Sequence, residues 1–206
     1  MIAIVDYGLG NLRAFSNVYR RLDVPHCLAD TPAKLAQSTR IILPGVGSFD
    51  YAMSKLNGSG MRETLESMVL ERRVPVLGVC VGMQMLADSS EEGVGKGLGW
   101  IPGRVRRFPV HDGGASRKYP LPHMGWNNVI VDREAALLSG LDAGARFYFL
   151  HSYYFECADS RWSLASSEYI RKFSCVIGRE NIYGVQCHPE KSHRDGIELL
   201  KNFASV

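Results

Sequence analysis

Short apolar runs alternate with amphipathic segments along the first half of the chain. Residues 1–5, 41–43 and 76–80 are apolar runs rich in β-branched residues, and a glycine follows each of them within three residues. Runs of this kind are typical of strands that are buried on both faces of a parallel sheet. Residues 11–23 and 60–72 instead place their apolar side chains on one helical face. The alternation predicts an α/β fold with an open, mostly parallel sheet flanked by helices.

The pattern changes after about residue 95. Glycine and proline become frequent there and the apolar runs shorten, so we expect extra antiparallel strands in the C-terminal half. The expected β segments are residues 104–110, 126–131, 145–150, 175–178 and 182–187, and a closing helix is expected over 194–204. No repeat, low-complexity tract or linker separates the two halves. We therefore expect a single domain over residues 1–206.

Composition and charge exclude several classes of protein. The 206 residues carry a formal net charge of +3, which gives no reason to expect a nucleic acid or an anionic membrane as partner. The apolar run before Asp6 is too short for a signal peptide or a membrane span. Five dispersed cysteines without C-x-x-C spacing argue against a disulfide framework or a zinc site. A reduced, cytoplasmic setting is expected.

The sharpest local signal for chemistry is Gly78-Val79-Cys80-Val81-Gly82, in which a predicted strand runs into a cysteine that has a glycine two residues away on each side. Residues 83–87 then read as a helix, so the stretch matches a nucleophile elbow with cysteine in the serine position. The positive end of such a helix favours the thiolate. We expect Cys80 to be a nucleophile, and the alternative is a buried structural cysteine.

A thiolate nucleophile needs an acid–base partner, and His188 is the best placed of the six histidines. It comes at the C-terminal end of a predicted strand, where open α/β sheets gather catalytic groups. Pro189 ends that strand because it has no N–H to donate. Glu190 can hold the imidazole in one tautomer and complete a Cys–His–Glu relay. The string His–Pro–Glu is weak evidence for a relay when it stands alone, and it becomes stronger evidence because the nucleophile elbow is also present.

A third feature, Pro44-Gly45-Val46-Gly47, directly follows the second predicted strand. Its glycines let backbone N–H groups face a pocket, which suits an oxyanion hole completed by the N–H of Val81. Standing alone, the stretch would be interpreted as a turn that ends a strand.

Together these features resemble the class I, or triad, glutamine amidotransferases, a family with a flavodoxin-like fold. Within that family the chain is most similar to the glutaminase subunits of imidazole glycerol phosphate synthases. The motif blocks that carry the resemblance are 6–12 (DYGLGNL), 43–49 (LPGVGSF), 78–84 (GVCVGMQ), 122–127 (PHMGWN), 149–153 (FLHSY), 184–192 (GVQCHPEKS) and 199–203 (LLKNF). The blocks cover essentially the whole chain.

In that family a cysteine thiolate attacks the side-chain amide of glutamine, ammonia leaves, and water frees glutamate from the thioester. The resemblance implies that Cys80 is the nucleophile, His188 the base and Glu190 its orienting partner, with no cofactor and no metal. It implies that the oxyanion site is formed by Gly45, Val46, Gly47 and Val81. It implies that the substrate glutamine is held by Gln84, Glu92, Ser152 and Tyr153.

The resemblance also implies a partner. The family's glutaminase subunits form a heterodimer with a (β/α)₈ barrel subunit, which receives ammonia through an internal channel and makes imidazole glycerol phosphate and AICAR in histidine biosynthesis. The implied docking positions are Asn11, Met124, Trp126 and Lys191. Core packing is the alternative for Met124 and Trp126. A solvated surface role is the alternative for Asn11 and Lys191.

Two departures from the family pattern leave the acceptor of the ammonia open. Cys187 stands before His188 where an aromatic residue is expected, and we expect it to be a small core residue that faces away from the substrate. Segments 154–174 and 191–196 resemble a paralogous subgroup that feeds ammonia to a related barrel in surface-polysaccharide pathways. That subgroup is the alternative function.

A stand-alone cysteine hydrolase is a more distant alternative, because the same Cys–His–Glu relay would serve it. Blocks 6–12 and 122–127 would then have no explanation. Two further histidines of the motif blocks, His123 and His151, are expected to make structural hydrogen bonds rather than to catalyse.

Overall fold

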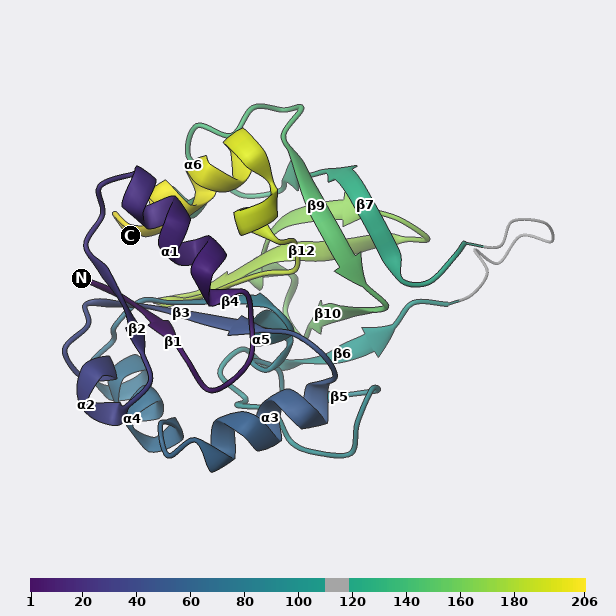
Figure 1. Cartoon of the computed structure of the whole chain (residues 1–206). Helices are drawn as coiled ribbons and strands as arrows, with labels where there is room; N and C mark the ends of the chain where they lie inside the picture. Colours follow the sequence, from purple (N-terminus) through teal and green to yellow (C-terminus); the bar gives the residue numbers. More distant parts are fainter. Residues whose placement is uncertain (110–118) are drawn as a thin grey trace.

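The computed structural model describes residues 1–109 and 119–206. Its main sheet begins with five strands that pair in parallel (Figure 1). They lie in the order β2 (His26–Ala29), β1 (Ile2–Val5), β3 (Arg40–Gly45), β4 (Val76–Cys80) and β13 (Ile182–Val185). The three apolar runs of the first half form β1, β3 and β4, and nearly all of their residues are buried. β13 comes from far along the chain and lies beside β4.

Helices cover both faces of this parallel part (Figure 1). One face carries α1 (Leu12–Arg21) and α6 (His193–Phe203), and the other carries α2 (Pro32–Leu35), α3 (Phe49–Gly58) and α4 (Arg62–Glu66). Three residues of the predicted apolar stripe of α1, Phe15, Val18 and Tyr19, are buried. The hydroxyl of Tyr19 donates to the carbonyl of Leu200 in α6 at 3.2 Å. Within the described part of the chain, no helix combines the length and hydrophobicity needed to cross a membrane.

Beyond β13 the sheet turns antiparallel, as expected for the C-terminal half. The next strands are β12 (Lys172–Arg179), β10 (Tyr153–Cys157) and β6 (Gly103–Arg107), and β5 (Ser89–Ser90) adds a parallel edge. β11 (Ser163–Glu168) pairs with β12 and with β8 (Ile130–Val131). β7 (His123–Asn128) and β9 (Arg146–His151) form a separate two-stranded sheet. The predicted fold class is confirmed.

Several elements differ from the sequence-based prediction. No element is predicted where α3 lies, although its buried residues 49, 52, 53 and 56 have helical spacing. β2 is an edge strand that fully buries only Ala29, so its apolar signal is weak. The predicted helix over 60–72 is divided, because α4 passes into a π-helical turn at Ser67–Glu71.

The second half also departs from the prediction in its details. The predicted strand 126–131 is divided between β7 and β8. The predicted strand 104–110 ends at Arg107, and its last position lies outside the described residues. Segment 154–174 is a regular part of the sheet because it holds most of β10, all of β11 and the start of β12. The serine-rich sequence of β11 has too little apolar alternation to predict a strand.

Candidate active site

Cys80 closes β4 and opens a single helical turn, α5 (Val81–Gln84). Its φ of 55° and ψ of −114° form a strained conformation that persists only where the surrounding structure enforces it. A Cβ at Gly78 would overlap the backbone of Gly82, and a Cβ at Gly82 would overlap the carbonyl of Leu43 on β3. The turn therefore requires both glycines, as the elbow pattern predicts. Its helix covers residues 81–84 rather than the predicted 83–87.

His188 lies just past β13, and because β13 is the neighbour of β4, its ring comes within reach of Cys80. The Nδ1 of His188 lies 2.9 Å from Oε1 of Glu190, and both side chains are buried. A carboxylate only accepts hydrogen bonds, so Nδ1 is the donor and Nε2 is left to face the sulfur. The N–H of His188 donates to the carbonyl of Tyr148 on β9 at 2.9 Å. The hydroxyl of Ser192 donates to the carbonyl of His188 at 2.6 Å.

Two opposed effects set the charge of His188. Burial disfavours the charged ring and lowers its pKa, but the side chains of Cys80 and Glu190 outweigh burial and raise the pKa to about 10. At neutral pH the ring is therefore an imidazolium. An imidazolium beside a thiol favours the thiolate, which is the nucleophilic form of cysteine.

The predicted oxyanion stretch lies directly against the elbow. Gly45, the last residue of β3, is paired with Cys80 on β4, and a Cβ at Gly45 would overlap the backbone of Gly82. The hydroxyl of the buried Tyr7 donates to the carbonyl of Pro44 at 2.6 Å. Burial and the nearby Cys80 both raise the pKa of Tyr7, so it remains a neutral donor. Tyr7 thus fixes the start of the stretch, a role that the sequence did not indicate.

The rest of the stretch extends toward solvent. The side chain of Val46 is exposed, and Gly47 has a φ of +86°. A hollow of about 10 Å³ is lined by Asn11, Val46 and His188 among others, so the structure brings the oxyanion stretch and the predicted base to one place. Val81 is the first residue of α5, where a helical N–H has no partner within its own helix.

The predicted substrate residues fall into two groups, and Gln84 and Tyr153 form the first. The Nε2 of Gln84 donates to the carbonyl of Tyr153 at 3.3 Å and to Oε1 of Gln186 at 3.0 Å. The Nε2 of Gln186 in turn lies 3.8 Å from the sulfur of Cys80. Gln186 is absent from the predicted site residues although it lies within block 184–192. The available signal was an amide side chain at the end of an apolar strand.

Glu92 and Ser152 make up the second group. The Oε2 of Glu92 accepts from the N–H of Phe49 at 2.8 Å, so the carboxylate sits at the start of α3. The carbonyl of Ser152 accepts from the N–H of Phe108 at 3.0 Å. These contacts hold Glu92 and Ser152 to elements other than the elbow.

The four predicted docking residues are all exposed. The side chains of Met124 and Trp126 on β7 are 67% and 39% exposed, which rules out the alternative of core packing. The ring of Trp126 stacks on that of His193 with centroids 5.1 Å apart. Asn11 and Lys191 are also exposed, and Lys191 lies over the ring of Tyr148 at 5.8 Å.

Three other side chains of the motif blocks are structural. Nδ1 of His123 and Nε2 of His151 are 3.0 Å apart, and Nδ1 of His151 donates to the carbonyl of Tyr153 at 2.7 Å. Burial lowers the pKa of His123 to about 4 and that of His151 to about 3, so both rings are neutral at pH 7. Cys187 is buried, and burial raises its pKa well above the usual range. The expected hydrogen bonds of the two histidines are present.

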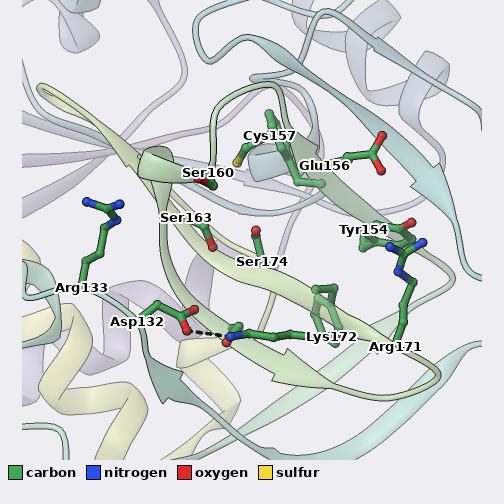
Figure 2. Close-up of a pocket in the computed structure, with 13 residues that line it drawn as sticks. Asp132, Arg133, Tyr154, Glu156, Cys157, Ser160, Ser163, Arg171, Lys172 and Ser174 are labelled. Carbon is green, nitrogen blue, oxygen red and sulfur yellow. Dashed lines mark hydrogen bonds and ion pairs between the residues drawn. The ribbon is translucent and has the colours of Figure 1, made fainter.

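A larger hollow of about 510 Å³ lies over β10, β11 and β12 (Figure 2). Lys172 pairs with Asp132 there at 2.9 Å, and the guanidinium of Arg171 lies 5.4 Å from the ring centre of Tyr154. None of the predicted site residues is among the described residues that line it. This hollow is therefore separate from the Cys80 site.

Comparisons with known proteins agree with the geometry. The family model "Glutamine amidotransferase class-I" matches residues 3–206. A protein of Bdellovibrio bacteriovorus named imidazole glycerol phosphate synthase subunit HisH is 58% identical over 209 residues, covering all of both chains. The protein of the same name from Leptospira interrogans is 49% identical, again over the full length of both.

Solved structures show the same fold at low sequence identity. A crystal structure of a glutamine amidotransferase superposes with a TM-score of 0.73 at 16% identity, over 100% of this chain and 99% of that one. A glutamine amidotransferase from Thermotoga maritima gives a TM-score of 0.63 at 18% identity, over 92% of this chain and 75% of that one.

Proposed function

The chain belongs to the class I glutamine amidotransferase family, and from that premise we propose that it is the glutaminase subunit of an imidazole glycerol phosphate synthase. In this role it hydrolyses L-glutamine to glutamate and ammonia, and passes the ammonia to a (β/α)₈ barrel subunit. Residues 1–206 act as one glutamine amidotransferase domain.

The observation that carries the proposal is the meeting of Cys80 with His188 and Glu190. Cys80 ends β4 while the other two follow β13, and the two strands are adjacent and parallel. An imidazole whose Nδ1 binds a buried carboxylate and whose pKa is raised by a neighbouring cysteine is the relay that thiol-dependent acyl transfer requires. Full-length identity of 58% to a relative named for this synthase supports the finer assignment.

The first half of the reaction uses the thiolate of Cys80. It attacks the side-chain carbonyl carbon of glutamine, the C–O π electrons move to oxygen, and a tetrahedral oxyanion forms. We assign the stabilising N–H donors to Gly45, Val46, Gly47 and Val81. When the oxyanion collapses, the C–N bond breaks and the charged His188 gives its proton to the departing nitrogen, which leaves as ammonia.

The second half regenerates the enzyme. His188 is now neutral at Nε2 and accepts a proton from water as the water oxygen attacks the γ-glutamyl thioester. The C–S bond breaks, glutamate leaves, and the thiolate–imidazolium pair returns. Glu190 keeps Nδ1 as the donor throughout, so Nε2 always faces the reacting atoms.

Substrate binding is assigned to Gln84, Glu92, Ser152 and Tyr153. The Nε2 of Gln84 already donates to the carbonyl of Tyr153 and to Oε1 of Gln186, so the Oε1 of Gln84 is the atom available to glutamine. One oxygen of Glu92 binds the start of α3, which leaves Oε1 for the α-ammonium of the substrate. Backbone groups around Ser152 and Tyr153 are assigned to the other end of the amino acid.

Docking to the barrel partner is assigned to the two-stranded sheet of β7 and β9 and its neighbours. Exposed methionine and tryptophan side chains are enriched at protein interfaces, and Met124 and Trp126 both lie on β7. Lys191 and Asn11 complete the assigned surface. We place this heterodimer in the cytoplasm, which suits a chain whose five cysteines are all free.

The proposal is tested by measuring glutamate release by the purified chain, alone and with a histidine-pathway barrel protein and its acceptor. Release is expected to be slow alone and to rise strongly in the complex. Activation only by a barrel from a surface-polysaccharide pathway would replace the proposed acceptor, and full activity without any barrel would favour the stand-alone hydrolase.

The docking assignment has its own test. Trp126→Ala is expected to weaken the complex by about tenfold or more, because buried aromatic anchors carry much of the binding energy of an interface. Leu70→Ala is the matched control, since Leu70 is also exposed but follows α4 on the opposite face of the sheet. Equal affinity of the two variants would remove Trp126 from the interface.

A further inference from the structure

The environment of the sulfur includes one group that the triad does not use. Gln186 is 0% exposed, and its N–H donates to the carbonyl of Cys175 on β12 at 2.8 Å. A buried primary amide is costly unless both of its ends find partners. Both ends do find partners here, since Oε1 accepts from Gln84 and Nε2 points to the sulfur of Cys80.

The direction of these amides is determined by a backbone carbonyl. The carbonyl of Tyr153 can only accept, so the side-chain group of Gln84 that faces it at 3.3 Å must be Nε2. That same Nε2 lies 3.0 Å from the side chain of Gln186, which must therefore present Oε1 to it. The amide of Gln186 is left with its Nε2 toward the sulfur of Cys80. Rotating either amide by 180° would place two oxygens or two N–H groups against each other.

We propose that Gln186 is a positioning residue for the nucleophile: its Nε2–H holds the sulfur of Cys80, in an orientation set by Gln84 and the carbonyl of Tyr153. This inference rests on the proposed function, in which Cys80 attacks glutamine. An N–H donor at 3.8 Å favours a charged sulfur over a neutral one and restricts its rotation about the Cα–Cβ bond. The amide cannot take up the proton, so it stabilises the thiolate without quenching it.

Two groups therefore act on the sulfur. His188 exchanges the proton with it, and Gln186 holds the sulfur while the proton is on His188. It also gives Gln84 a role beyond the substrate, because its Nε2 is used to orient Gln186. The amide side chains of Gln84 and Gln186 are both buried, so neither the orienting role of Gln84 nor the holding role of Gln186 depends on a solvent-exposed group.

The test uses Gln186→Met, which retains most of the volume and removes the donor. Alkylation of Cys80 by iodoacetamide is followed by mass spectrometry of its peptide, from pH 5 to pH 10. The variant is expected to react about tenfold more slowly at pH 7, with its pH profile moved to higher pH, because a hydrogen bond to the charged sulfur is lost. In the glutaminase assay kcat is expected to fall about tenfold while KM changes less than threefold.

Gln84→Met is the companion variant. It is judged by alkylation alone, because iodoacetamide does not need the glutamine site. With Gln84 replaced, the amide of Gln186 is free to turn its oxygen to the sulfur, so a shift of the pH profile in the same direction is expected. If Gln186→Met does not fold, as judged by thermal unfolding, Gln186→Asn replaces it, since the shorter amide keeps polarity but falls short of the sulfur.

A wild-type alkylation profile and a kcat within twofold of wild type in the folded Gln186 variant would overturn the inference. The proposed function is judged separately by Cys80→Ala. If that variant still hydrolyses glutamine, the function is wrong. If it is inactive while the Gln186 variant behaves as wild type, only the positioning role is lost.

Discussion

Two buried histidines, His188 and His151, are both tied to β9 but have opposite charge states. His188 and His151 are each 6% exposed, and both are tied to β9, His188 through the carbonyl of Tyr148 and His151 as the last residue of the strand. Nevertheless the pKa of His188 is raised to about 10, whereas that of His151 is lowered to about 3. Burial lowers the pKa in both cases, so burial does not decide the sign.

The partners decide it. His188 faces the Cys80 sulfur and the Glu190 carboxylate, which both favour a charged ring. His151 faces a backbone carbonyl and the neutral ring of His123. These groups do not offset the loss of solvation that a charged ring would suffer, so the pKa stays low. A buried histidine is therefore a charged catalyst or a neutral structural link according to whether an anionic group lies beside it.

The largest expected effect breaks this contrast at its sulfur. Cys80→Ala removes the proposed nucleophile, and glutamine turnover is expected to fall by about 10³-fold or more. The same change removes the strongest favourable contact of His188, so the pKa of its ring is expected to fall below about 10 and approach the ordinary value. Glutamate release measures the first effect, and NMR titration of the ring measures the second. An unchanged His188 titration would show that Glu190 alone holds the proton.

Glu190→Gln should have the next largest effect. The neutral amide no longer favours the imidazolium, so the pKa of His188 is expected to fall. We expect kcat to drop about tenfold to a hundredfold. This loss is smaller than the roughly 10⁴-fold loss in enzymes whose serine nucleophile depends on its triad carboxylate. The pH profile of kcat measured from pH 5 to pH 10 checks this. Glu198→Gln, on the exposed part of α6, is the control and should leave kcat unchanged.

The pH dependence of stability sharpens the contrast between the two sites. The pKa of His151 is lowered, so its contribution is present above about 6.5 and is lost as the pH falls toward about 3, because the unfolded chain binds a proton that the folded chain refuses. The pKa of His188 is raised, so its contribution is present below about 6.5 and is lost as the pH rises toward about 10.

His151→Asn is expected to flatten the acid side only. The amide of asparagine can still donate to the carbonyl of Tyr153 but does not titrate, so the fall in the free energy of unfolding between pH 7 and pH 5 should shrink by about 2 kcal/mol. Urea unfolding at the two pH values measures this. An equal fall in the wild type and the variant would mean that His151 does take up a proton in the folded protein.

The smallest expected effect lies at the outer end of the neutral pair. The Nδ2 of Asn127 donates to the carbonyl of Glu168 at 2.7 Å and lies 3.3 Å from Nε2 of His123. Asn127→Ala should lower the free energy of unfolding by about 1 kcal/mol, the usual worth of such a hydrogen bond. Glutaminase activity without a barrel partner is expected to remain within twofold. A large loss of activity would mean that the neutral pair does more than hold β7 against β9.

Much of the fold could be predicted because strands buried on both faces appear in the sequence as continuous apolar runs. β1, β3 and β4 are such runs, whereas the edge strand β2 and the serine-rich β11 are not. α3 was predictable from its helical spacing but is missing from the prediction. The site follows the same rule, since Cys80 is marked by the glycines around it, and Gln186 has no marker apart from its polarity among apolar neighbours.

By itself, the sequence determines that Cys80 sits on a strained turn and that His188 and Glu190 lie two residues apart. Both are local matters, because the overlap of a Cβ at Gly78 with the backbone of Gly82 and the reach of a carboxylate to a nearby ring depend only on residues close in the chain. Only the tertiary structure places β13 beside β4, and thereby His188 and Gln186 beside the sulfur. It alone decides which buried histidine is charged, because that choice depends on groups that long-range strand pairing brings together.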